Sequence, residues 1–168
     1  WTTAAPYLGV AGLIVAFVIY GRIKGADAGS PEIQELSDAI HEGAMIFLSR
    51  EYKVLSYFVC CIFLLLLVLV SIQKGLWVGI WTAIAYIAGA GCSMLAGYFG
   101  INAATTAGVR TSQAAMNGGQ EKALHVAFNG GAVMGLCVAS LGLIGVGGLF
   151  TLLGRGDTIT ALIGFAVG

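Results

Sequence analysis

The stretch from Ala123 to Gly154 reads ALHVAFNGGAVMGLCVASLGLIGVGGLFTLLG, and its 32 residues include no Asp, Glu, Lys or Arg. The same holds for residues 1–21, 54–73 and 75–109. A helix crosses the hydrocarbon core of a bilayer with about 20 apolar residues. Each of the four stretches is long enough to span, so the sequence predicts an all-α membrane protein built as a polytopic helical bundle.

The composition points the same way. Hydrophobic residues make up 58% of the chain and charged residues 10%, and the mean hydropathy is +0.93. A soluble domain has about 25% charged residues. The formal net charge is zero and there is no basic tract, which argues against a nucleic-acid partner.

We expect a single transmembrane region over residues 1–168. The predicted spans cover residues 6–20, 54–72, 76–99 and 123–152, and a fifth begins at 159–168. Turns are predicted at 73–75 and 117–119. Because the chain opens with Trp1 and closes inside an apolar run, we expect it to be an internal piece of a longer protein.

Residues 31–53 form the one long polar segment, and apolar side chains recur in it at helical spacing. We expect an amphipathic cytoplasmic helix that continues into the second span. Ser30 suits the N-cap and Pro31 the first helical position. One face is acidic and is either solvated or able to bind a cation; it carries Glu32, Glu35, Asp38 and Glu42.

Lys and Arg in the loops predict the orientation, because cytoplasmic loops carry an excess of them. Six lie in the loops that follow the first and third spans, namely Arg22, Lys24, Arg50, Lys53, Arg110 and Lys122. Only Lys74 and Arg155 lie in the other two loops. The N-terminus is therefore expected outside.

Small residues recur at intervals of four in the third and fourth predicted spans. The third span carries Ala85, Gly89, Ser93 and Gly97, and the fourth carries Gly131, Gly135, Ala139 and Gly147. Such residues let helix backbones approach closely. We expect the two spans to pack through these faces, with Gly135 in the contact and Leu136 facing lipid.

Candidate chemistry is sparse, and we predict no catalytic, cofactor-binding or metal-binding residue in this chain. The cysteines lie inside spans without metal-ligand spacing and are interpreted as small apolar fillers; they are Cys60, Cys61, Cys92 and Cys137. His41 and His125 are interpreted as structural. Arg110 follows a long helical pattern, and two interpretations stay open: a snorkelling anchor, or a buried partner for a carboxylate elsewhere.

Three local patterns carry a resemblance to a known family. They are ELSDAIHEGAMIFLSREYK at 35–53, GINAATTAGVRT at 100–111 and ALHVAFNGGAVMGL at 123–136. In this order they resemble the N-terminal part of the membrane-bound, ion-pumping pyrophosphatases. Two positions depart from the family pattern: Asn102 stands where a basic residue is usual, and Gly108 replaces the usual Asn.

The resemblance implies a fold of about sixteen transmembrane helices in two concentric rings, with the first four in the outer ring. It implies a homodimer in the bilayer that hydrolyses pyrophosphate with Mg²⁺ and moves protons or sodium ions. The family's Asp-rich ligand motifs are absent from these 168 residues. This segment is then outer-ring scaffold packed on inner-ring helices, in a prokaryotic inner membrane, and inactive alone. The alternative is a non-enzymatic membrane scaffold or transporter subunit with an acidic docking helix.

Overall fold

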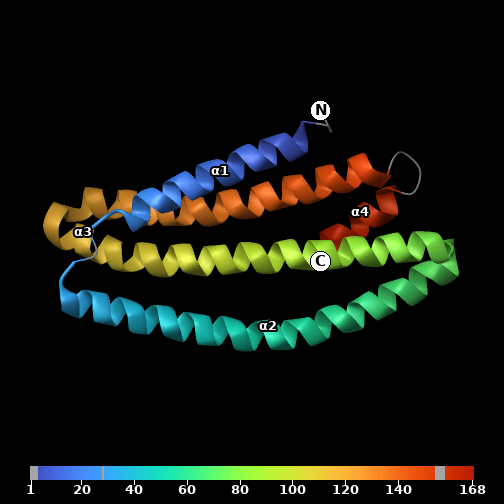
Figure 1. The fold of residues 1–168 in the computed structure, drawn as a ribbon, viewed down its shortest axis with the longest axis horizontal. Helices are drawn as coiled ribbons and strands as arrows, with labels where there is room; N and C mark the ends of the chain where they lie inside the picture. Colours follow the sequence, from blue (N-terminus) through green and yellow to red (C-terminus); the bar gives the residue numbers. More distant parts are fainter. Residues whose placement is uncertain (1–3, 28, 154–157) are drawn as a thin grey trace.

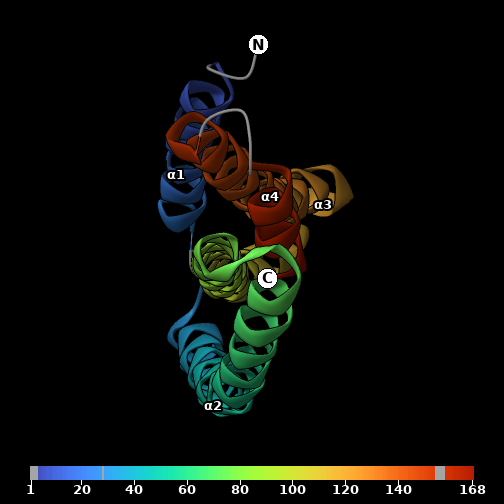
Figure 2. The same ribbon diagram turned by 90° about the vertical axis from the view of Figure 1, so that its right-hand side faces the viewer.

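The computed structural model describes residues 4–27, 29–153 and 158–168, and every regular element within them is a helix. The elements are α1 (Ala5–Lys24), α2 (Pro31–Lys74), α3 (Leu76–Leu153) and α4 (Thr158–Val167). The long helices lie side by side along one axis (Figure 1). Seen along that axis, α1 and α2 lie on opposite sides of α3 (Figure 2). The all-α fold class is confirmed.

The longest helix, α3, folds back on itself at Gly119, where the backbone has φ 74° and ψ −176°. We call residues 76–118 its first arm and residues 120–153 its second arm; the reversal is visible in Figure 1. The turn predicted at 117–119 is therefore confirmed. Three helices, α1, α2 and α3, are long and apolar enough to cross a membrane. The two arms of α3 match the third and fourth predicted spans in position.

The amphipathic segment and the second predicted span form one continuous helix, α2, of 44 residues. Ser30 occupies the N-cap position with an extended backbone, but its side chain makes no capping hydrogen bond. The Ser30 carbonyl accepts the first helical N–H, from Gln34, at 3.1 Å. Gln34 Nε2 also donates to the Gly29 carbonyl at 2.9 Å, so Gln34 ties the loop to the helix.

The main core lies where α1 crosses both arms of α3. It is built largely from small side chains, which allow the backbones to approach closely. At one crossing, a Cβ on Gly9 of α1 would lie 2.7 Å from the Ser140 carbonyl oxygen of the second arm. The buried cluster consists of Ala16, Ile23, Ala103, Ala107, Val133 and Cys137.

The third and fourth predicted spans do not pack through the residues that were predicted to lie between them. Gly89 faces the backbone of Phe165 in α4, and Gly97 faces the Tyr52 hydroxyl of α2. On the second arm, Gly131, Gly135 and Ala139 are exposed. Gly147 faces Pro6 of α1. Within the described residues, the small side chains of the two predicted faces therefore contact other helices or no helix.

The arms of α3 meet through a different set of residues. A Cβ on Gly130 would lie 2.6 Å from the Ala107 Cβ, and one on Gly100 would lie 2.9 Å from Met134 Cγ. The physical reason is the helical period. Each residue turns about 100° at 3.6 residues per turn, so a strict four-residue repeat drifts by about 40° per interval. A row of residues at this spacing therefore turns around the helix axis and cannot face one neighbouring helix along its whole length.

The expected roles of Gly135 and Leu136 are also reversed. A side chain added at Gly135 would meet no atom within 4 Å. Leu136, expected to face lipid, is partly buried and packs against the main core. Leu136 is therefore the packed member of the pair in the described structure.

The short helix α4 lies between the two arms and contacts both. Its Ala161 and Phe165 form a second buried cluster with Ala85 of the first arm, and a Cβ on Gly145 of the second arm would meet the Phe165 ring. Near the turn at Gly75, Lys74 Nζ donates to Thr160 Oγ1 at 2.9 Å. These contacts hold α4 at the end of the bundle opposite the Gly119 turn (Figure 1).

Candidate functional site

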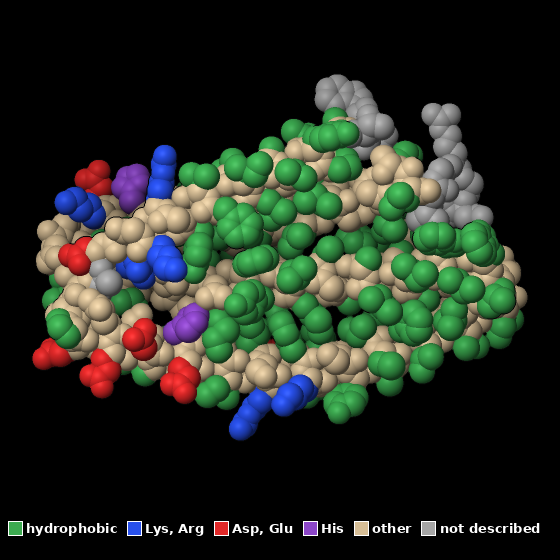
Figure 3. Space-filling view, viewed as in Figure 1, with side chains coloured by type: hydrophobic (Ala, Val, Ile, Leu, Met, Phe, Trp, Pro, Cys, Tyr) green, Lys and Arg blue, Asp and Glu red, His purple; other side chains and the backbone are tan. Residues whose placement is uncertain are grey.

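On the face shown in Figure 3, charged side chains gather at the end of the molecule that contains the Gly119 turn, and the side chains coloured by type at the other end are hydrophobic. A polar cavity of about 390 Å³ lies at the charged end, between α1, α2 and the first arm. Its lining residues are Tyr20, Lys24, Gln34, Ser37, Asp38, His41, Asn102, Thr105, Thr106, Val109 and Arg110. We call it the polar cavity.

Arg110 is the organising side chain of the polar cavity, and its partners are backbone carbonyls. Its Nη2 donates to the Lys24 carbonyl at 3.1 Å and its Nε to the Ala26 carbonyl at 3.3 Å. Nη1 donates to the Thr106 carbonyl, one turn earlier in the first arm, at 3.1 Å. The last carbonyls of a helix lack intrahelical donors and carry partial negative charge. Arg110 therefore caps the C-terminal end of α1.

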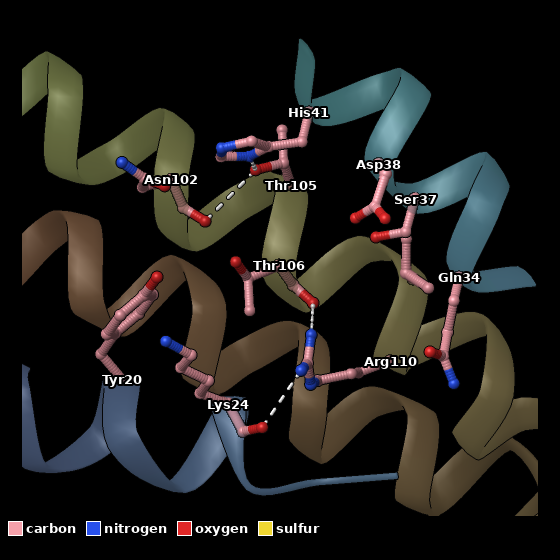
Figure 4. Close-up of a pocket in the computed structure, with 11 residues that line it drawn as sticks. Tyr20, Lys24, Gln34, Ser37, Asp38, His41, Asn102, Thr105, Thr106 and Arg110 are labelled. Carbon is pink, nitrogen blue, oxygen red and sulfur yellow. Dashed lines mark hydrogen bonds between the residues drawn. The ribbon is translucent and has the colours of Figure 1, made fainter. Parts of the chain in front are cut away.

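Of the two sequence interpretations of Arg110, the snorkelling anchor does not describe this arrangement, because a snorkelling side chain would extend into water. The described residues do not test a buried pair with a carboxylate elsewhere, so that interpretation stays a prediction. Figure 4 shows the guanidinium turned toward the end of α1. The partners were missed because a backbone carbonyl leaves no residue-type signal in a sequence.

His41 connects α2 to the first arm. Its Nδ1 lies 3.0 Å from Thr105 Oγ1, and the Thr105 hydroxyl also lies 2.9 Å from the Ile101 carbonyl. These contacts agree with a structural role for His41. One turn of α2 away, Asp38 and Ser37 border the same cavity (Figure 4).

A second, more apolar cavity of about 300 Å³ adjoins the polar one. The two cavities share the side chains of Tyr20 and Asn102. The other lining residues of this apolar cavity are Ala16, Phe17, Tyr98, Phe99, Val133 and Cys137. Sequence reasoning singled out neither cavity, because each is assembled from helices far apart in the chain.

The described residues do not fit a magnesium site. They include no group of three His, Cys, Asp or Glu side chains close enough to hold a metal ion. The acidic face of α2 is exposed along Glu32, Glu35, Asp38 and Glu42, and Asp38 is the one carboxylate among the residues that line the polar cavity. Mg²⁺ is held through carboxylates and waters, so no step through Mg²⁺ can be placed on these residues.

The cysteines divide into two kinds. Cys137 is buried in the main core and Cys92 is partly buried, as expected for small apolar fillers. Cys60 and Cys61 are exposed on α2, so the filler interpretation does not describe them in this structure. All four are free thiols. The expectation that the chain holds no catalytic, cofactor-binding or metal-binding residue stays a prediction.

Comparison with known proteins gives a consistent set of relatives. The sequence model of the family described as inorganic H+ pyrophosphatase matches residues 10–168. A putative K(+)-stimulated pyrophosphate-energized sodium pump of Clostridium tetani is 46% identical over 128 residues, covering 76% of this chain and 18% of that protein. A K(+)-insensitive pyrophosphate-energized proton pump of Methanosarcina mazei is 37% identical over 164 residues, covering 98% of this chain and 23% of that protein.

A third relative, K(+)-insensitive pyrophosphate-energized proton pump 2 of Moorella thermoacetica, is 37% identical over 167 residues. That match covers 97% of this chain and 23% of the relative. The chain thus spans about a fifth of the length of these curated relatives. The family match includes every residue of the two cavities described above.

Proposed function

The chain belongs to the inorganic H+ pyrophosphatase family, and on that premise we propose that it is part of a pump that couples hydrolysis of pyrophosphate to ion transport. The observation that supports this proposal most strongly is the family match over residues 10–168. The relatives include both a putative sodium pump and proton pumps. The proposal therefore covers movement of protons or of sodium ions.

Within that pump, this segment is the scaffold of an outer ring of helices around the catalytic ones. The distribution of charge supports the role. In the described residues most charged side chains gather toward one end of the bundle (Figure 3), and the transmembrane stretch 76–109 holds no charged residue. Ionisable residues inside the membrane mark ion pathways and proton relays, and this stretch carries no such mark.

The chain is an integral membrane protein, and we propose the inner membrane of a prokaryotic cell with the N-terminus outside. The six-to-two distribution of Lys and Arg supports this orientation. In this orientation the polar cavity faces the cytoplasm. A homodimer and bound Mg²⁺ complete the proposal, with the Mg²⁺ ligands on residues outside this chain.

Transport assays on membrane vesicles test the proposal. Vesicles carrying the full-length gene product should accumulate ions when pyrophosphate is added, detected as quenching of a pH-sensitive dye or uptake of radioactive sodium. The 168-residue chain alone should release no phosphate from pyrophosphate in Mg²⁺ buffer above a mock preparation. Vesicles that neither hydrolyse pyrophosphate nor move an ion would leave the scaffold or transporter-subunit alternative.

A further inference from the structure

We propose that the polar cavity and the apolar cavity together form one binding site for an anionic glycerophospholipid. The lipid phosphate lies at Lys24 and Arg110, and the start of an acyl chain lies in the apolar cavity. The proposal does not depend on the pump activity. It rests on the shape and charge of the two cavities and on the orientation proposed above.

The charge of the polar cavity favours an anion. Lys24 and Arg110 contribute two positive charges, and Asp38 contributes one negative charge. Arg110 donates three hydrogen bonds to carbonyls, and a guanidinium has five N–H donors. With respect to the described residues, two donors remain for a ligand, and the Lys24 ammonium supplies three more. Asp38 can accept hydrogen bonds from hydroxyl groups of a polar headgroup such as glycerol.

The two cavities match the two parts of an amphiphile: the polar cavity suits a headgroup and the apolar cavity suits an acyl chain. Tyr20 and Asn102 line both of them, so one ligand can pass from one to the other. From this junction the apolar cavity follows α1 back to Ala16 and the first arm back to Tyr98. Both directions lead away from the charged ends of their helices. Phe17 and Tyr98 are 54% and 43% exposed, so the apolar cavity is open at the surface of the bundle that the described residues form.

The position along the bundle suits a lipid rather than a buried substrate. The polar cavity lies at the end of α1, directly after its last apolar turn, where the helix leaves the hydrocarbon for the headgroup layer. Anionic lipids of the cytoplasmic leaflet attract basic side chains at this depth. The polar cavity therefore meets a phosphate at the level where lipid phosphates lie.

Lipid retention by the purified full-length protein tests the site. Native mass spectrometry and the thermal midpoint in detergent are measured with phosphatidylglycerol, with phosphatidylcholine, and with inorganic phosphate alone. Lys24→Gln removes a cavity charge but keeps the backbone carbonyl that Arg110 binds. Arg22→Gln is the matched control, because Arg22 lies in the same last turn of α1 and outside the cavity. Lys24→Arg tests rescue.

The expected result is that phosphatidylglycerol binds and raises the midpoint more than phosphatidylcholine, and that Lys24→Gln weakens its binding about tenfold, as for loss of a charged hydrogen bond. Arg22→Gln and Lys24→Arg should bind as the parent protein does. Equal retention of both lipids, or equal binding by both Gln variants, would overturn the proposal. Stabilisation by inorganic phosphate to the same extent would identify a free anion instead of a lipid.

Discussion

At the scale of single residues, Arg110 fastens the end of α1 through carbonyls of Lys24 and Ala26. We expect Arg110→Lys to lower the thermal midpoint, because lysine keeps the charge but cannot reach these carbonyls with a rigid fork. The cost should be about 1.5–3 kcal/mol, the range of one hydrogen bond to a charged group. Arg50→Lys, at an exposed position of α2, is the control, and an equal effect of both would contradict the capping role.

Gly89 offers a second test at this scale. A Cβ there would collide with the backbone of Phe165 in α4, which cannot move aside as a flexible side chain would. We expect Gly89→Ala to destabilise the protein by about 1–3 kcal/mol. Gly91→Ala is the matched control.

Gly91 lies two residues further along the same arm, and a Cβ there would meet nothing within 4 Å. Alanine is the better helix former by about 1 kcal/mol, so Gly91→Ala should be neutral or stabilising. Thermal midpoints in one detergent compare the two variants. A midpoint of Gly89→Ala at or above that of Gly91→Ala would show that α4 does not approach the first arm this closely.

At the scale of elements, the glycine that reverses α3 carries the clearest prediction. Gly119 has φ 74° and ψ −176°, a conformation almost restricted to glycine. Gly119→Ala should therefore cost about 1–3 kcal/mol, read as a lower thermal midpoint. Gly108→Ala serves as control, because Gly108 lies within the first arm and has free space around it. Equal midpoints would mean that the turn is placed at another residue.

The elements themselves were largely predictable from the sequence, and their contacts were not. The apolar stretches, Gly75 and the glycines near residue 119 indicate helices and turns, because length and backbone freedom are local properties. Gly75 indeed has a positive φ of 95°. Which neighbours Gly135 and Leu136 contact depends instead on how the helices cross. The sequence repeat does not show this, because residues spaced four apart drift around the helix axis. The cavities depend on the same crossings.

At the scale of the whole molecule, the orientation in the membrane can be measured. Single cysteines at Ser30 and Gln73, in a cysteine-free background, lie near opposite ends of α2 and are both exposed. An impermeant maleimide should label Ser30→Cys from the cytoplasmic side and Gln73→Cys from the outside. Gln73 is preferred to Gly75, whose φ of 95° disfavours a side chain. Labelling of Ser30→Cys from the outside would contradict the orientation.

The cap on α1 also has a consequence for biosynthesis. Arg110 lies 86 residues after Lys24, whose carbonyl it binds. A ribosome adds about 5–20 residues per second, so the first helix waits roughly 4 to 17 seconds for this partner to be made. During that interval the end of α1 depends on water, lipid headgroups or the insertion machinery for its hydrogen bonds. Newly made α1 can therefore be fastened in place only after the first arm of α3 has been inserted beside it.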